Sequence, residues 1–339
     1  MPVYTLPYQH LDGLLGKEIG VPDSGQWLQP ASIDLPIGWK VYRLSSSFIP
    51  YPGSLIDSLS RNKTIEHETE VYPSFVIEPL VHYLFELDVE LELDFSHWGV
   101  FHTRSTAGRN DLLVSIIGDR QPLFNEVGRG YRGKLWMLVY SHSFAITVRP
   151  GDCLAQMRVQ TEFESTSAMH RYLPTSSLRY PIRVSAYPDE SGAVGWQAKY
   201  NEVPFHWRDR NVNKLGYFSP VMPHLGGDGE YQITLPSGAF TILRSLRQFS
   251  VAKNQALTID TYVSGIGEFR SHYAGFVDPG FGLDEASSIV FEARSPYRLN
   301  LVHGQVFAMA QVEHLIEPTE FPYKGNYNGQ DLRLAVQFI

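Results

Sequence analysis

Two acidic residues, each within an apolar run, have a residue type and spacing that could support base chemistry. Asp278 ends a run of apolar and aromatic residues, and Pro279 and Gly280 follow it directly. Pro279 fixes its own φ and Gly280 permits a backbone path that other residues resist, so we expect a strand ending in a tight turn with a carboxylate at its mouth. Glu292 lies inside a second apolar run, at 288–293. Because a carboxylate at a strand centre is costly to bury without a partner, the two acids predict a small pocket with base chemistry.

Each acid also has a simpler structural explanation. An Asp before Pro-Gly often only caps a turn, and a Glu in a strand often faces solvent. The flanking residues Val290, Phe291 and Ala293 do not decide which face Glu292 takes.

A second segment, RSTAGR at 104–109, has the composition of an anion-binding site. Its two guanidinium groups and two hydroxyls lie within one turn and belong to Arg104, Ser105, Thr106 and Arg109. A guanidinium can bind two phosphate oxygens at once, and hydroxyls and backbone N–H groups complete such a shell. Gln156, which follows a turn at Gly151, is a further polar residue with two possible explanations. The simpler explanations are a solvated loop for RSTAGR and an exposed strand residue for Gln156.

The elements that must position these residues are predicted to be mostly strands. Near-alternation of apolar and acidic residues at 87–93 predicts a half-exposed strand. Further strands are expected at 112–117, 134–140, 144–148 and 154–159. A second strand-rich block runs over 196–314 and includes a strand at 288–294. One helix is expected near 10–20, and 53–70 is expected to be a loop. The composition of 166–195, rich in Ser, Tyr, Pro and charge, predicts a linker.

Length and composition limit the class of protein. A chain of 339 residues can bury a large core and is expected to hold two domains. Aromatic residues at 13%, with 28 Gly and 22 Pro, favour strands and turns over helices. A formal net charge of −8 argues against a general nucleic-acid or membrane-surface binder. A single cysteine, Cys153, no evident signal peptide and no long apolar run together predict a cytoplasmic protein.

The two halves of the chain repeat one order of features. In each half a Gly-rich turn leads to a strand, then to a second turn with Gly, then to a short apolar segment, and the two copies begin near residues 130 and 280. A duplicated all-β unit explains this better than two unrelated domains do, so we place the domains at 1–165 and 196–339.

Five motifs in order make both halves resemble the dUTPase and dCTP deaminase superfamily. The motifs are QPASIDL at 29–35, RSTAGR at 104–109, VDPGFG at 277–282, VFE at 290–292 and NYNGQ at 326–330. The chain is also similar to the tandem, double-length bacterial dCTP deaminases. The resemblance covers roughly 29–160 and 230–332. It implies two tandem dUTPase-like β-barrels of distorted jelly-roll type with few short helices, in a homo-oligomer that is a trimer or a pseudo-symmetric assembly of the repeats.

The resemblance also implies roles. Glu292 would act as base and then acid in deaminating dCTP to dUTP and ammonia, while Ser105 and Arg109 hold the attacking water. Asp278 would orient the sugar 3′-OH. The other implied substrate contacts are Arg104, Thr106, Gln156, Ala274, Phe276, Val290, Tyr323, Asn326, Tyr327 and Gln330. Within this set, the backbone from Ala274 to Phe276 would contact the cytosine edge, and the C-terminal tail would close over the triphosphate and be mobile without it.

The sequence favours a mechanism without zinc. Zinc-dependent deaminases use His and Cys ligands that include a Pro-Cys-x-x-Cys pair, and this chain has one Cys. A positioned carboxylate must then serve as base and acid. Mg²⁺ is expected only as the ion carried by the nucleotide triphosphate. His102, His272 and His303 are more simply explained as core histidines with satisfied hydrogen bonds.

Departures from the family pattern are complementary between the halves. In the first half Leu138 and Gly128 stand where the second half has its two acids. The second half lacks a counterpart of RSTAGR, Met309 replaces the Gln of the first half, and Asn326 replaces the Lys of the family's lid. We therefore expect one composite site built by both halves. The sequence leaves open whether the halves come from one chain or two, although the family's intersubunit sites slightly favour two.

Three functions remain open at this point. The favoured one is a dCTP deaminase, and the first alternative is a dUTPase or a bifunctional enzyme that continues to dUMP. Glu292 favours deamination, because dUTP hydrolysis needs only an acid such as Asp278. The second alternative is a nucleotide-binding regulator without catalysis, against which the retained Glu292, Asp278 and Arg109 argue.

Overall fold

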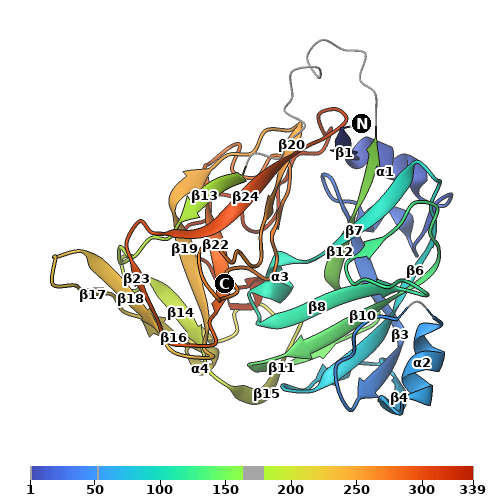
Figure 1. The fold of residues 1–339 in the computed structure, drawn as a ribbon, viewed down its shortest axis with the longest axis horizontal. Helices are drawn as coiled ribbons and strands as arrows, with labels where there is room; N and C mark the ends of the chain where they lie inside the picture. Colours follow the sequence, from blue (N-terminus) through green and yellow to red (C-terminus); the bar gives the residue numbers. More distant parts are fainter. Residues whose placement is uncertain (1, 52, 163–178, 339) are drawn as a thin grey trace.

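Strands form most of the chain in the computed structural model, which describes residues 2–51, 53–162 and 179–338 (Figure 1). The first half contains β1 (Val3–Thr5), β2 (Ile19–Gly20), β3 (Ile33–Leu44), β4 (Ile65–Glu70), β5 (Phe75–Ile77), β6 (His82–Glu92), β7 (His97–Thr103), β8 (Leu112–Gly118), β9 (Glu126–Val127), β10 (Arg132–Ser141), β11 (Phe144–Val148) and β12 (Cys153–Glu162). Its helical turns are α1 (Tyr8–Leu14), η1 (Ser24–Trp27), α2 (Leu55–Arg61) and α3 (Ser105–Gly108).

The second half continues in the same style. Its strands are β13 (Arg179–Arg183), β14 (Gly195–Ala198), β15 (Asn201–His206), β16 (Phe218–Val221), β17 (His224–Leu225), β18 (Tyr231–Leu235), β19 (Phe240–Phe249), β20 (Gln255–Ile259), β21 (Phe276–Val277), β22 (Ser287–Arg294), β23 (Leu299–Val302) and β24 (Val306–His314). Its helical turns are α4 (Lys214–Tyr217) and η3 (Val336–Phe338). The prediction of a mostly β protein with few short helices is confirmed.

The first half is organised around one large sheet with the strand order β8-β10-β6-β3-β12-β7-β9. Burial alternates along β6, where Leu87, Val89 and Leu91 are buried and the acids between them are exposed. This is the half-exposed strand that the sequence predicts. The second half has two four-stranded sheets, β13-β24-β20-β21 and β16-β14-β19-β22, and the three-stranded sheet β17-β18-β23.

The two halves share structure rather than meeting at a simple boundary. Strand β15 of the second half pairs in parallel with β11 of the first half. The end of the chain also packs into the first half's core, where the Phe338 ring lies 6.4 Å from that of Phe144 and Leu334 is buried. Figure 1 shows the C-terminus beside α3, between the two groups of strands. The second half therefore completes the first.

Two local predictions need correction. The helix expected near 10–20 ends at Leu14, because Gly16 has a positive φ of 71° and breaks the helical path. The loop expected at 53–70 contains α2, whose Leu55 and Leu59 are both buried one turn apart, and the charged edge strand β4.

The predicted linker is described only from residue 179 onward, and the rest of it lies outside the described residues. Residues 179–183 form β13, which pairs with β24. Ile182 and Val184 are buried, so this segment belongs to a sheet of the second half. Among the described residues no helix is long and apolar enough to cross a membrane.

Candidate active site

A small cavity lies where α3 of the first half meets β22 and the C-terminal tail of the second half. It is lined by Ser105, Arg109, His272, Ala274, Phe276, Val277, Asp278, Phe281, Ile289, Val290, Glu292, Tyr323, Tyr327 and Gln330. One chain therefore supplies the residues from both halves. The sequence leaves open whether one chain or two supply the halves, although the family's intersubunit sites slightly favour two; in this structure the residues of both halves lie together within one chain.

Glu292 projects from β22 into this cavity and is only 1% exposed. Every residue of β22 except the last is buried, so both faces of the strand are covered and alternation along the sequence cannot reveal which face Glu292 takes. The backbone N–H groups of Tyr273 and Ala274 donate to its Oε2 at 2.9 and 2.8 Å. On the other side is α3, where a Cβ built on Gly108 would lie 2.6 Å from the same oxygen.

Burial raises the pKa of Glu292 to about 7, although the Arg109 guanidinium and the two backbone donors oppose that shift. A carboxyl group with this pKa can accept a proton and return it near neutral pH, as general acid–base catalysis requires.

Arg109 lies at the C-terminal end of α3 and is buried. Its guanidinium carbon is 3.8 Å from the centre of the Tyr327 ring, and its Nη1 donates to the carbonyl of Arg333 at 3.0 Å. The Nε of Arg109 is buried and has no partner among the described residues. Ser105 begins the same helix, so a single turn places its hydroxyl and the guanidinium on the cavity.

The C-terminal tail covers the cavity through several specific contacts. The hydroxyls of Thr106 and Tyr327 lie 2.8 Å apart, and the Tyr327 N–H donates to the hydroxyl of Tyr323 at 3.3 Å. The Gln330 amide donates to the Ser288 carbonyl at 2.8 Å. In this structure the tail packs over the cavity, and the buried Leu334 and Phe338 hold the chain end against the core of the first half. That the tail is mobile without substrate stays a prediction.

Asp278 sits in the turn that the sequence predicts. Gly280 has a φ of 89°, and a Cβ on it would lie 2.6 Å from the side chain of Pro322, so the tail crosses directly over the turn. The Oδ1 of Asp278 is buried without a partner among the described residues. Burial and the nearby Asp34 raise the pKa of Asp278 to about 7, while Arg104, which is ion-paired to Asp34 at 3.0 Å, opposes the shift.

Four predicted contacts lie outside the cavity lining. Arg104 pairs with Asp34, Thr106 contacts the tail, and Gln156 accepts a hydrogen bond from Ser32 at 3.2 Å. Asn326 is exposed, and its backbone carbonyl binds the Arg333 side chain at 2.7 Å. Asn328, rather than Asn326, connects the tail to the turn after Asp278. Its side chain accepts a hydrogen bond from the Gly282 N–H at 2.8 Å.

His272 is a cavity residue to which the sequence assigned no functional role. It was expected to be a core histidine with satisfied hydrogen bonds. It is buried, but its Nδ1 has no partner among the described residues. Burial, followed by the charge of Arg109, lowers the pKa of His272 to about 3, so the ring is neutral. Its only signal in the sequence was its position two residues before Ala274.

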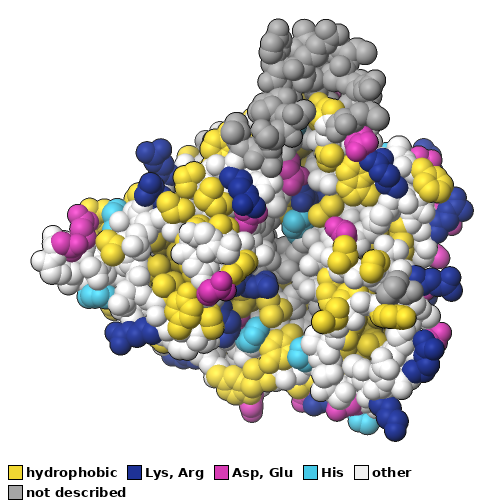
Figure 2. Space-filling model, viewed as in Figure 1, with side chains coloured by type: hydrophobic (Ala, Val, Ile, Leu, Met, Phe, Trp, Pro, Cys, Tyr) yellow, Lys and Arg dark blue, Asp and Glu magenta, His cyan; other side chains and the backbone are white. Residues whose placement is uncertain are grey.

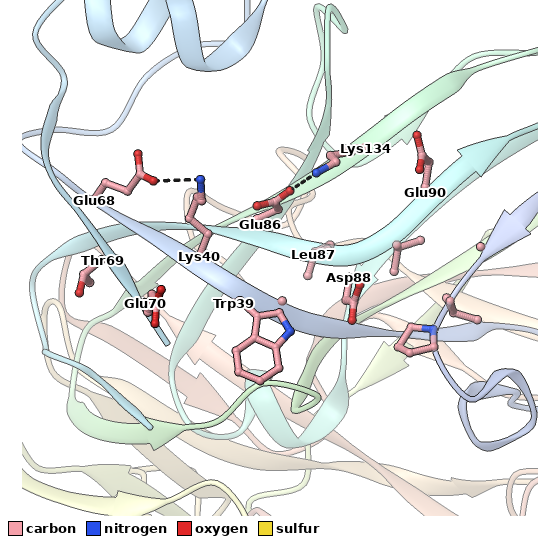
Figure 3. A pocket seen from close by; sticks show the side chains of 15 residues that line it. Trp39, Lys40, Glu68, Thr69, Glu70, Glu86, Leu87, Asp88, Glu90 and Lys134 are labelled. Carbon is pink, nitrogen blue, oxygen red and sulfur yellow. Dashed lines mark hydrogen bonds and ion pairs between the residues drawn. The ribbon is translucent and has the colours of Figure 1, made fainter. Parts of the chain in front are cut away.

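A larger hollow of about 990 Å³ lies elsewhere, between β3, β4 and β6 of the first half (Figure 3). Lys40 pairs there with Glu68 at 2.9 Å, and Lys134 pairs with Glu86. The other acids of its lining, Glu70, Asp88 and Glu90, form no ion pair with any residue that the structure describes. This surplus of negative charge would repel a triphosphate.

Charged groups are mixed elsewhere too. Figure 2 shows the Lys and Arg side chains of one face in separate groups rather than in one continuous patch. Among the described residues no three His, Cys, Asp or Glu side chains are grouped as metal ligands would be.

The comparisons with known proteins concern the whole chain and its two halves. A crystal structure of 2′-deoxycytidine 5′-triphosphate deaminase from Agrobacterium tumefaciens is similar over 94% of this chain and 100% of its own, with a TM-score of 0.82 and 27% sequence identity. No protein with a curated description matches the sequence significantly. Residues 6–163 match the family model of the 2′-deoxycytidine 5′-triphosphate deaminase N-terminal domain, and 158–338 match that of its C-terminal domain. The chain belongs to the 2′-deoxycytidine 5′-triphosphate deaminase family.

Proposed function

We propose that the cavity between α3, β22 and the tail is the site at which this enzyme deaminates dCTP to dUTP and ammonia, and that Glu292 moves the protons. The observation that carries the proposal is the environment of this carboxyl group. It is buried, its pKa is about 7, and both backbone donors bind Oε2, which leaves Oε1 for the attacking water.

The proton transfers follow from this arrangement. Ionised Glu292 takes a proton from the water as the water oxygen attacks C4 of the cytosine. Glu292 then delivers that proton to N3. The second proton of the water then reaches the exocyclic amine by the same carboxyl group, the C4–N4 bond breaks, and ammonia leaves as the C4 carbonyl forms. Ser105 and Arg109 orient the water, and the positive charge of Arg109 favours the ionised form of Glu292.

The triphosphate would be held by groups at the rim of the cavity and would bring its own Mg²⁺. The residues proposed for it are Arg104, Thr106, Gln156, Tyr323, Tyr327 and Gln330, while Asp278 binds the sugar 3′-OH, and Ala274, Phe276 and Val290 contact the base. No step in this mechanism uses zinc.

A second candidate activity, hydrolysis of dUTP to dUMP, is favoured by one observation. Asp278 has a buried, unpartnered oxygen and a pKa of about 7, which suits a base that activates water against the α-phosphate. Both activities can be followed in one assay, because chromatography separates dUTP from dUMP after incubation with dCTP, dUTP or dCMP and Mg²⁺.

The role of Glu292 is tested by Glu292→Gln, which keeps the shape and removes the base. We expect dCTP deamination to fall about 10²- to 10⁴-fold, with binding of a non-reactive dCTP analogue retained. The matched control is Glu285→Gln, since Glu285 is exposed in the turn before the same strand; it should turn over dCTP like the wild type. Wild-type turnover by Glu292→Gln would refute the proposed mechanism.

A further inference from the structure

We propose that Asp111 and Arg294 are positioning residues that clamp the two halves of the chain together and thereby hold the Glu292 carboxylate in its reactive geometry. The inference rests on the proposed role of Glu292. It concerns a part of the molecule behind the cavity, because neither side chain lines the cavity itself.

The clamp joins points next to the two catalytic segments. Asp111 lies two residues after Arg109, at the end of the turn that contains α3, and Arg294 lies two residues after Glu292 on β22. Residues two apart in a strand project from the same face, so Arg294 and Glu292 both point toward the first half. There the Nη2 of Arg294 forms an ion pair with the Oδ2 of Asp111.

A second contact of Arg294 connects it, through Tyr273, to the carboxylate of Glu292. Its Nε donates to the hydroxyl of Tyr273 at 3.1 Å. The backbone N–H of Tyr273 donates to the Oε2 of Glu292 at 2.9 Å. The same tyrosine is therefore fixed at its hydroxyl by the clamp and presents its N–H to the proposed base.

The segment that carries Tyr273 has backbone ties to β22 as well. Arg270 and Arg294 exchange two backbone hydrogen bonds of 2.9 Å, and the Glu292 N–H donates to the Ser271 carbonyl at 3.2 Å. These backbone bonds place 270–274 alongside β22. The hydrogen bond from Arg294 to the Tyr273 hydroxyl adds a side-chain link between the ion pair and this segment.

The carboxylate of the ion pair is buried, while the Arg294 side chain is 22% exposed, and local contacts hold the aspartate in one arrangement. Asp111 is fully buried, and Ser143 donates to the same Oδ2. The φ of Asp111 is 58°, a left-handed conformation that Asp and Asn tolerate better than most residues. Removing one partner of a buried pair leaves an uncompensated charge, so the remaining partner moves or admits water. A movement of Arg294 would reach Glu292 through Tyr273.

The test measures turnover and binding separately in Asp111→Asn and Tyr273→Phe. Asn keeps the size and the left-handed backbone at 111, and Phe removes only the hydroxyl at 273. We expect kcat at saturating dCTP to fall about 10- to 100-fold in Asp111→Asn and severalfold in Tyr273→Phe, while KM stays within about twofold, because misplacement of a reacting group lowers the chemical step. Adding Arg294→Met to Asp111→Asn should cost little more than either change alone, since the two residues act as one unit.

The control is another buried aspartate that is ion-paired to an arginine. Asp152 pairs with Arg208 at 2.6 Å, and its other oxygen accepts from the Arg149 N–H, outside the cavity. Asp152→Asn should leave kcat per folded chain unchanged.

A purely structural role for Asp111 would lower the melting temperature and the number of analogue-binding sites but leave kcat per site at the wild-type value, and that result would overturn the proposal. If Asp111→Asn does not fold, unchanged kcat in Tyr273→Phe would overturn it equally. Loss of activity in Glu292→Gln together with wild-type kcat in Asp111→Asn and Tyr273→Phe would reject the clamp alone. An active Glu292→Gln would reject the proposed base.

Discussion

Two carboxyl groups, Glu292 and Asp278, have a raised pKa because both are buried, but the charged and polar groups around them differ. At Glu292 burial acts against Arg109 and two backbone donors, whereas at Asp278 burial is reinforced by the like charge of Asp34. Both are close to half-ionised at neutral pH. Only Glu292 has fixed donors that would restore its orientation after each proton transfer.

This difference predicts how activity depends on pH. A base must be ionised, so kcat/KM for dCTP should fall as the pH drops below about 7, where Glu292 becomes protonated. The acidic limb should persist in Asp278→Asn, which should mainly raise KM through the lost sugar contact. Saturating Mg²⁺ throughout the series limits the contribution of the nucleotide's own phosphate ionisation. Loss of the limb in Asp278→Asn would identify Asp278, rather than Glu292, as the titrating base.

Sequence reasoning found these acids because their residue types are unusual in apolar runs. It could not orient Glu292, since β22 is covered on both faces and carries no alternation. It also missed His272, Asp111 and Arg294. Their importance comes from neighbours that are distant in the chain, such as the ion pair that spans 183 positions between Asp111 and Arg294, and no local pattern encodes such a contact.

At the scale of elements, the tail determines whether the site is open. The cavity has a volume of about 40 Å³, enough for only a few water molecules. Tyr327 stacks on Arg109 within it. A nucleotide therefore requires the segment around Tyr327 to move while the chain end beyond it stays anchored.

Gln337 is the anchor whose removal tests this arrangement. It is fully buried, accepts from the Asn110 amide at 3.1 Å, and donates to the Trp207 carbonyl at 2.7 Å. Gln337→Leu leaves that carbonyl unsatisfied, so we expect a loss of about 1–3 kcal/mol in the free energy of unfolding. Chemical denaturation measures this loss. Hydrogen exchange should increase in 331–338 more than in β22, and equal stability with unchanged exchange would contradict the anchoring role.

The strands were predicted well where one face is exposed, as along β6, and less well where the pattern is short. Helix α2 was missed because its two buried leucines lie in a polar segment. The pairing of β15 with β11 was not foreseen, since a parallel contact between the halves depends on the whole topology. The order of the motifs in both halves was enough to predict the fold class.

At the scale of the whole molecule, both halves line one cavity, and the proposed site divides its roles between them. The first half supplies α3, with Ser105 and Arg109, and the second supplies the acids and the lid. This division explains why Leu138 and Gly128 stand in the first half where the second has its acids: with the site formed between the halves, the first half needs no base of its own. A homo-oligomer remains a prediction.

Complementation between inactive chains tests the central claim most directly. Arg109→Ala and Glu292→Gln chains, carrying different tags, would be co-expressed and purified together, and their dCTP deaminase activity would be compared with that of each variant alone. If one chain builds the whole site with Glu292 as its base, as the structure indicates, the mixture should show only the residual activity of the two variants. Recovery toward about a quarter of wild-type turnover, the share of sites with two intact halves in a random mixture of chains, would contradict a site built within one chain.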